Sequence, residues 1–167
     1  MKGFHFGPWP IRPNEIFFTS KLSIGLVNLK PIVPGHVLVV PRRIVLRFAD
    51  LTSDEVSDMF LSAQAIGKVI EREYGGESLT ITLQDGPKAG QTVPHVHVHV
   101  IPRKTGDWAN NDDIYPEIDR KEKELAGELK APKGVDNEER PPRTQEDMGR
   151  EAEQLRKHFQ QYEDIWN

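Results

Sequence analysis

Apolar residues gather in five short segments that predict β-strands. Each segment is rich in β-branched or bulky apolar residues and is bounded by Pro, Gly or Asp, which is typical of strands that end in turns. Pro34-Gly35 precedes the third segment, and Pro41 ends it. The predicted strands are Ile16–Thr19, Ser23–Leu29, His36–Val40, Leu79–Gln84 and His95–Ile101.

The apolar pattern changes to the period of a helix between the third and fourth predicted strands. Thr52 with Glu55 three residues later is a capping-box pattern, and Gly75-Gly76 supplies a stop. The pattern therefore predicts a helix over Ser53–Tyr74. Its apolar stripe, which predicts a core-facing or subunit-facing side, consists of Val56, Met59, Phe60, Ala63, Ile66, Val69 and Ile70.

The last third of the chain is strongly charged. Residues 103–143 are dominated by Lys, Glu, Asp, Arg and Pro, which predicts a mobile stretch because few apolar residues offset the entropy of ordering it. A second helix is predicted from about Gln145 to Tyr162. The predicted organisation is a body of residues 1–118, a mobile charged insert 119–143 and a C-terminal helix 144–167 that packs on the body or on a partner chain. The apolar seam of that helix is Met148, Ala152, Leu155, Phe159 and Tyr162.

Closely spaced strands with one long helix between them predict an α+β fold built on an antiparallel sheet. The 167 residues fit one domain. The chain has no cysteine, which excludes disulfides, a thiolate nucleophile and cysteine-ligated zinc. We expect no nucleic-acid partner, since the formal net charge is -4, and no membrane partner, since no apolar run approaches about 20 residues. We expect a cytoplasmic location, extending to the nucleus, because no signal peptide is discernible at the start.

Three histidines alternate with valine in the last predicted strand, His-Val-His-Val-His-Val at residues 95–100. Because strand side chains alternate between faces, His95, His97 and His99 share one face and the valines the other. A purely structural role for all three is disfavoured, since each buried imidazole needs hydrogen-bond partners. Two chemistries fit: zinc binding, or attack of one histidine on phosphorus while its neighbours orient it or handle the leaving group.

The loop at residues 84–93 favours phosphate over metal. Gly86 and Gly90 permit close backbone approach to a ligand, and backbone N–H groups in such turns form anion-binding nests. A phosphate chain would use this array of donors, whereas a zinc site has little need of it. The neutral side-chain donors of the loop are Gln84, Gln91 and Thr92.

Residues nearer the start complete the candidate pocket. His36 opens the third strand, and if it lies near the histidine segment it can fix the tautomer of an active imidazole. Asn28, at the end of its strand, can bind a sugar hydroxyl. Apolar residues that can form a slot for a flat base, although each alone fits plain core, are Phe6, Trp9, Ile11, Leu26, Val27 and Leu38.

Short motifs around the histidines form one set. They are Gln84-Asp85-Gly86-Pro87, Ala89-Gly90-Gln91-Thr92-Val93, the histidine segment followed by Ile101-Pro102-Arg103, Lys30-Pro31, residues 33–39 and Asn111-Asp112-x-Ile114-Tyr115. This set resembles the histidine triad (HIT) superfamily, and specifically its fragile histidine triad (Fhit) branch. The resemblance covers roughly residues 4–118 and extends to the last helix.

The resemblance implies a HIT-like fold with a five-stranded antiparallel sheet, a homodimer whose two sheets join, and a bis(5'-adenosyl)-triphosphatase that cleaves diadenosine triphosphate to AMP and ADP. His97 would attack the α-phosphorus and become nucleotidylated, and His99 would contact the bridging or leaving oxygen. His36 and His95 would support the imidazole network. The implied substrate contacts are Asn28 for ribose, Gln84, Gly90, Gln91, Thr92 and Val93 for phosphate, and Phe6, Trp9, Ile11, Leu26 and Leu38 for adenine.

The resemblance also implies that a divalent cation, Mg²⁺ or Mn²⁺, arrives with the polyphosphate, with no tightly bound cofactor and no dedicated metal site. Three alternatives stay open at this point. The first is a nucleoside phosphoramidate hydrolase or nucleotidyl transferase of the same superfamily. The second is a nucleotide-binding signalling module in which the complex matters more than turnover. The third is a metal-binding protein.

Overall fold

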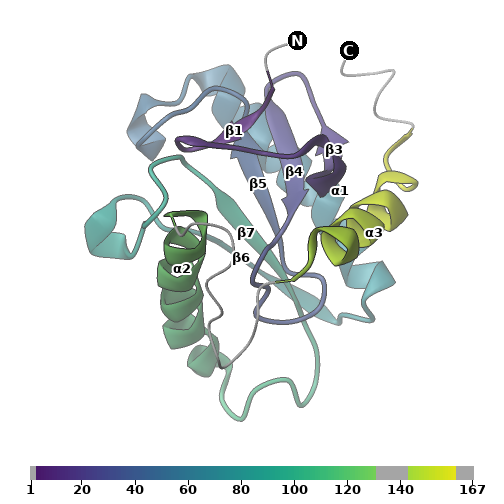
Figure 1. Ribbon diagram of the computed structural model, residues 1–167. Helices are drawn as coiled ribbons and strands as arrows, with labels where there is room; N and C mark the ends of the chain where they lie inside the picture. Colours follow the sequence, from purple (N-terminus) through teal and green to yellow (C-terminus); the bar gives the residue numbers. More distant parts are fainter. Residues whose placement is uncertain (1–2, 131–142, 161–167) are drawn as a thin grey trace.

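A five-stranded antiparallel sheet with strand order β3-β4-β5-β7-β6 forms the centre of the computed structural model, which describes residues 3–130 and 143–160 (Figure 1). This confirms the predicted α+β fold. Strand β7 lies between β5 and β6, so the residues that precede it reach the middle of the sheet. The strands are β3 (Ile16–Thr19), β4 (Ser23–Val27), β5 (Val37–Pro41), β6 (Ser78–Leu83) and β7 (Val98–Arg103).

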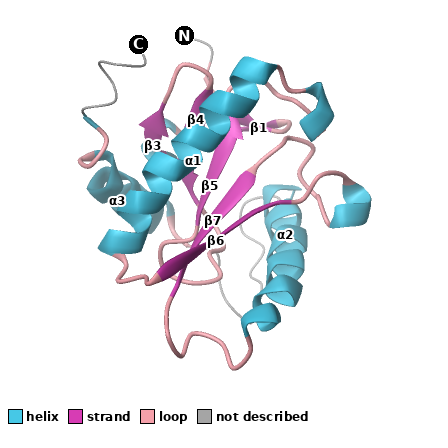
Figure 2. Cartoon of the chain, turned by 180° about the vertical axis from the view of Figure 1, so that it is seen from behind, coloured by secondary structure: helices cyan, strands magenta, loops and turns pink. Residues whose placement is uncertain are grey.

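The remaining elements cover the two faces of this sheet. A hairpin of β1 (His5–Phe6) and β2 (Trp9–Pro10) precedes it. Helices α1 (Ser53–Glu73) and α2 (Ile114–Lys130) lie on opposite faces, with α1 behind the sheet in Figure 1 and in front of it in Figure 2. Helix α3 (Gln145–Arg156) lies beside β3. Within the described residues, no helix is long and apolar enough to cross a membrane.

Helix α1 begins and ends where its sequence predicts. The Thr52 side chain accepts from the backbone N–H of Glu55, and the Glu55 side chain accepts from the backbone N–H of Thr52. Gly75 follows the helix with φ +65°, a conformation that glycine adopts readily. Most of the predicted apolar stripe is buried against the sheet, but the Phe60 side chain is 41% exposed.

Alternation along the strands separates two apolar cores. Val96, Val98 and Val100 face α1 and α3, whereas Leu38 and Leu26 face the other side. The side chains of α3 that complete the first core are Met148, Ala152 and Leu155, joined by Phe159 just beyond the helix. The C-terminal helix therefore packs on the body of its own chain. It ends at Arg156, earlier than predicted, and residues 161 and 162 of the prediction lie outside the described part.

The charged stretch predicted to be mobile is instead a helix, α2, as far as residue 130. The prediction was wrong there because sparse apolar residues can still lie on one helical face, and the buried ones in α2 are Ile114, Ile118, Leu125 and Ala126. Arg120 also forms ion pairs with Glu117 and Glu124 along the helix. The predicted boundary at residue 118 falls inside α2, and residues 131–142 of the predicted insert lie outside the described part.

Gly35 sets the entry into β5 and thereby the position of His36. Its φ is +90°, and a Cβ there would lie 2.6 Å from Cγ of the Tyr74 ring. We expect Gly35→Ala to lower the free energy of unfolding by about 3 kcal/mol, because left-handed strain of about 1–2 kcal/mol adds to an overlap in a packed core. Gly75→Ala, with φ +65° and no atom within 4 Å of the new Cβ, should lose only the strain. The free energy of unfolding of each variant is measured by urea unfolding. Equal decreases for Gly35→Ala and Gly75→Ala would contradict the predicted overlap with Tyr74.

Candidate active site

A carboxylate from α2 lies between His99 of β7 and His97, which directly precedes that strand. Oε1 of Glu122 is within hydrogen-bond distance of Nε2 of His97 and is 2.8 Å from Nε2 of His99. The two imidazole centroids are 5.2 Å apart. All three side chains are buried. The predicted co-facial histidines thus meet an acidic partner that the sequence did not assign to them.

Backbone groups fix the tautomers of the imidazole network. The N–H of Ile32 donates to Nδ1 of His36 at 3.0 Å, which leaves the proton of neutral His36 on Nε2. That proton is donated to Nδ1 of His99, 2.9 Å away. The proton of neutral His99 is therefore on Nε2, where it is donated to Glu122.

The tautomer of His97 is set in the opposite sense. Its Nδ1 lies 2.7 Å from the carbonyl oxygen of His95, and because a carbonyl only accepts, Nδ1 must carry a proton. When His97 is neutral, its lone pair is consequently on Nε2, the nitrogen that faces Glu122. The network therefore presents a nucleophilic nitrogen on His97 beside a donor N–H on His99.

His95 connects this network to the N-terminal hairpin. Its Nδ1 accepts from the backbone N–H of Gly7 at 3.1 Å, and its Nε2 donates to the carbonyl of Pro41 at 2.9 Å. The Phe6 ring packs against both His95 and His97, with centroid distances of 5.8 and 5.1 Å. With both nitrogens bonded to the backbone, His95 supports the site rather than offering a free nitrogen to a ligand.

Burial and charge divide these groups into neutral and charged members. Burial lowers the pKa of His36 well below its usual range, and it also lowers the pKa of His99. Burial lowers the pKa of His95 to about 4. Burial alone would lower the pKa of His97 too, but the Glu122 carboxylate outweighs it and raises that pKa. Burial would raise the pKa of Glu122, but His97 and His99 hold it well below its usual range, so His97 and Glu122 form a buried ion pair.

Asn28 lies beside His36, as the predicted ribose contact requires. Its Nδ2 is 3.3 Å from Nε2 of His36, and its Oδ1 accepts from the backbone N–H of Lys30 at 2.9 Å. Arg143, which precedes α3, donates from Nε and Nη2 to the carbonyl oxygen of Asn28. Asn28 is 3% exposed, so its side chain is held in place within the site.

The side chain of Gln91 is used inside its own loop. Its Oε1 accepts from the backbone N–H of Gly86 at 2.7 Å, and its Nε2 donates to the carbonyls of Leu46 and Val93 at 3.1 and 3.0 Å. This side chain therefore shapes the loop, and a phosphate contact from residue 91 would have to use the backbone.

Gln84 and Thr92, both predicted to hold phosphate, instead contact acidic residues of α2. Nε2 of Gln84 donates to Oδ1 of Asp119. Oγ1 of Thr92 lies 2.6 Å from the carbonyl oxygen of Glu122 and 2.8 Å from its Oε2. A Cβ on Gly90 would come within 2.4 Å of Nε2 of Gln84, so the glycine leaves room for that side chain. Two predicted phosphate donors thus already face carboxylates.

The predicted base-slot residues form one apolar cluster on the histidine face. Val27 was wrongly placed in this slot: it belongs to the core under α1, because Leu26 and Val27 are neighbours in β4 and must face opposite ways. From α2, Leu125 and Ala126 are buried in the same cluster. The other predicted members in it are Phe6, Ile11 and Leu38, with Trp9 packed against them, and Val93, which was predicted to hold phosphate, is buried in this cluster too.

His97, His99 and Glu122 also satisfy the spacing of a metal site, because their ligand atoms all lie within 4.8 Å of one another. Two imidazoles and one carboxylate suit zinc rather than Mg²⁺ or Mn²⁺, which prefer oxygen donors. The hydrogen bond from His36, however, leaves an N–H and not a lone pair on Nε2 of His99. The set therefore does not fit the Mg²⁺ or Mn²⁺ expected with the substrate.

Comparison with known proteins assigns the family. Residues 11–106 match the HIT domain family. This chain belongs to the histidine triad family. It is 50% identical over 156 residues to an Arabidopsis thaliana protein named bifunctional bis(5'-adenosyl)-triphosphatase/adenylylsulfatase FHIT, covering 93% of this chain and 84% of the relative. It is also 50% identical over 157 residues to a bis(5'-adenosyl)-triphosphatase of Dictyostelium discoideum, covering 94% of this chain and 93% of the relative.

Solved histidine triad structures share the fold. The C. elegans NitFhit protein superposes with a TM-score of 0.72 at 35% identity, covering 93% of this chain, which spans 30% of the length of that protein. The Plasmodium falciparum diadenosine triphosphate hydrolase superposes with a TM-score of 0.62 at 32% identity, covering 77% of this chain and 88% of that protein. The fragile histidine triad branch inferred from the sequence is thus confirmed.

Glu122 is the residue of this histidine triad site that the sequence reasoning missed. It lies in the stretch predicted to be mobile, so no partner was sought there. The signal was present: Ile114, Ile118, Leu125 and Leu129 recur at helical spacing, and Glu122 lies on the same side. Charge content concealed this pattern.

Acid should destabilise this protein through its buried neutral histidines. For His95, whose folded pKa is about 4, the unfolded chain binds the proton first, near pH 6.5, so the free energy of unfolding falls as pH drops from about 6.5 to 4. His36 and His99 act in the same direction, while the raised pKa of His97 acts in the opposite one. We expect His95→Gln to reduce the slope of stability against pH in this window by up to about 1.4 kcal/mol per pH unit.

The measurement is urea unfolding at a series of pH values. His5→Gln, at an exposed histidine outside the network, is the matched loss of an imidazole against which the His95→Gln profile is compared. A His95→Gln profile parallel to that of the wild type would mean that His95 does not stay neutral in the folded protein.

Proposed function

We propose that this protein hydrolyses dinucleoside polyphosphates, cleaving diadenosine triphosphate to AMP and ADP through a nucleotidyl group on His97. The observation that carries the proposal is the bond from Nδ1 of His97 to the carbonyl of His95, which keeps a proton on Nδ1, so the lone pair of neutral His97 is on Nε2. The names of two relatives at 50% identity, both bis(5'-adenosyl)-triphosphatases, support the substrate class.

In the first step, Nε2 of His97 attacks the α-phosphorus of one nucleotide. A P–N bond forms, the bond from that phosphorus to the bridging oxygen breaks, and ADP leaves. His99 is suited to assist, because its Nε2–H is fixed by His36 and can donate to the bridging oxygen as negative charge develops there. Backbone groups thus position both the nucleophile and the donor before substrate arrives.

In the second step, water attacks the same phosphorus. The P–N bond breaks and its electron pair returns to Nε2, AMP is released, and the proton of the water passes to the solvent, which leaves His97 neutral. Splitting the reaction replaces one difficult displacement by two easier ones. The slot around Phe6 and Leu38 would take adenine, and Asn28 would take the ribose.

A divalent cation in this proposal is bound by the polyphosphate. The oxygen atoms of a triphosphate match the preference of Mg²⁺ and Mn²⁺, whereas the set of His97, His99 and Glu122 does not. The cation would reduce the negative charge of the substrate. The protein residues supply the nucleophile and the donor.

His97→Ala should abolish turnover while leaving the fold intact. We expect the hydrolysis rate of diadenosine triphosphate to fall by at least about 1000-fold, because the lone pairs of neutral His36, His95 and His99 already accept hydrogen bonds from the backbone or from another histidine. The measurement is ion-exchange separation of products, which should be equal amounts of AMP and ADP for the wild type. His5→Ala is the matched control and should keep the full rate.

Two outcomes would count against this function. Substantial activity of His97→Ala would exclude the nucleophilic role. A wild-type protein that cleaves a nucleoside phosphoramidate but leaves diadenosine triphosphate intact, with Mg²⁺ or Mn²⁺ present, would assign it to the alternative hydrolase class.

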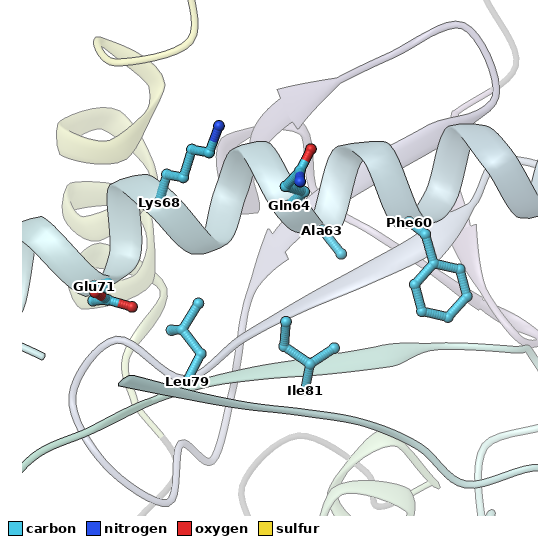
Figure 3. A pocket seen from close by; sticks show the side chains of 7 residues that line it. All are labelled: Phe60, Ala63, Gln64, Lys68, Glu71, Leu79 and Ile81. Carbon is cyan, nitrogen blue, oxygen red and sulfur yellow. The ribbon is translucent and has the colours of Figure 1, made fainter. Parts of the chain in front are cut away.

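We also propose a homodimer in which β6 of two copies meet. Strand β6 is the edge of the described sheet, and Ile81 on it is 46% exposed. Phe60 of α1, which lines the same hollow as Ile81, is 41% exposed. Figure 3 shows the hollow between α1 and β6, into which Leu79 and Ile81 point. An exposed apolar patch beside an open strand edge is suited to a second copy of this chain.

Ile81→Arg should weaken this dimer. We expect the dissociation constant to rise by at least about 100-fold, because a guanidinium would be buried in an apolar interface. Sedimentation velocity over a concentration series gives the constant. Ile44→Arg, at a residue that is 51% exposed elsewhere on the surface, is the matched control. A wild type that stays monomeric at high concentration would contradict the dimer.

The cytoplasmic and nuclear location expected from the sequence stays a prediction, which imaging of the tagged protein in its native cells would check.

A further inference from the structure

Helix α2 covers the active site on the histidine face of the sheet (Figure 1). The Glu122 side chain is completely buried there. Its Oε1 contacts Nε2 of both His97 and His99, and its Oε2 accepts from Oγ1 of Thr92 at 2.8 Å. These contacts join α2 to the reacting group, to the donor and to the loop predicted to hold phosphate.

The Glu122 carboxylate takes the place of a phosphate group. Nε2 is the one nitrogen of His97 that can attack phosphorus, because Nδ1 is bonded to the carbonyl of His95. An oxygen within hydrogen-bond distance of Nε2 therefore occupies the position that the α-phosphoryl group must enter. A carboxylate resembles a phosphate in presenting anionic oxygens to the same donors. Glu122 and the substrate cannot occupy this position together.

The second half of α2 fills the predicted base slot. Leu125 and Ala126 are 5% and 6% exposed and belong to the same apolar cluster as Phe6 and Leu38. Leu129 packs against that cluster. The helix thus places an anionic group in the phosphate position and apolar side chains in the base position. Its side chains therefore occupy the same two subsites as a bound nucleotide would.

The first turn of α2 is anchored outside the site. Ile114 and Ile118 are buried in a separate cluster with Ile101 and Ile32. The helix could therefore leave the histidines while its N-terminal end stays attached. Ion pairs of Lys30 with Glu124 and Glu128, at 3.6 and 3.2 Å, hold the other end in the closed position.

We propose that α2 is an autoinhibitory helix that competes with nucleotide for the active site, with Glu122 in place of the reacting phosphate. The proposal rests on the proposed function for the identity of the site. It makes the apparent association constant for nucleotide equal to the intrinsic constant multiplied by the fraction of molecules in which the helix is displaced. Changes that weaken or strengthen α2 should therefore shift nucleotide binding in opposite directions.

The test is titration calorimetry with AMP on the full chain. Glu122→Ala removes the carboxylate but keeps a good helix former, so AMP should bind about tenfold more tightly than to the wild type. Gly127→Ala adds a methyl group at an exposed position with no atom within 4 Å and stabilises the helix, so AMP should bind several-fold more weakly. Lys123→Gln, a change of charge at an exposed position of the same helix with a residue of similar helix propensity, is the control and should leave binding unchanged.

Hydrogen exchange on the wild type gives an independent measurement. Saturating AMP should accelerate exchange of the α2 amides from about residue 119 to 129 and leave α1 unchanged. Slower exchange of α2 with AMP would mean that the helix closes over the nucleotide, which overturns the proposal. Unchanged or weaker AMP binding by Glu122→Ala, or absence of AMP binding by all the variants, would overturn it as well.

These outcomes are separable from a failure of the proposed function, because AMP binding requires no turnover. If Glu122→Ala binds AMP more tightly but the wild type does not cleave diadenosine triphosphate, the hydrolase assignment fails and the autoinhibition stands. If the wild type cleaves that substrate and all the variants bind AMP equally, the autoinhibition fails and the hydrolase stands.

Discussion

The hydrogen bond from the backbone of Ile32 to Nδ1 of His36 is the constraint on which the active site depends. It decides which nitrogen of His36 carries the proton, and hence which nitrogen of His99 does. Together with the bond from His97 to the carbonyl of His95, it places one lone pair and one N–H side by side. Without these bonds, each histidine could carry its proton on either nitrogen. The main-chain groups therefore determine which nitrogen of His97 can attack and which nitrogen of His99 can donate.

The sheet makes this arrangement possible because His99 lies in β7, between two other strands, and His97 directly precedes it. Strand β7 pairs with β5 on one side and β6 on the other, and His99 faces Leu38 and Thr82 across these pairings. The valines between the histidines bury the opposite face under α1. The predicted strand from His95 was too long at its start, because β7 begins at Val98; His99 lies in β7, whereas His95 and His97 lie in the segment that leads into it. The alternation of faces nevertheless extends through this segment, since Val96 shares the core with Val98 and Val100.

Much of the fold and of this site could be predicted from the sequence, and the misses have physical causes. The strand period placed the three histidines on one face, and the Thr52–Glu55 pattern fixed the start of α1. The high charge content of residues 103–143 led to the wrong prediction of a mobile stretch where α2 lies, because a few apolar residues on one side are enough to hold a helix. Without that helix, Glu122 could not be recognised as a partner of the histidines. The hydrogen bonds of the Gln91 side chain within its own loop depend on a turn geometry that the sequence motif does not specify.

The most direct measurement of the central claim is chemical trapping of the intermediate. Diadenosine triphosphate is mixed with the wild-type protein, the reaction is stopped with denaturant at alkaline pH, where a phosphoramidate survives, and the peptides are mapped by mass spectrometry. An adenylyl group on His97, appearing as fast as the first ADP is released, is the predicted result. Release of AMP and ADP with no modified histidine, or an adenylyl group on any other residue, would contradict it.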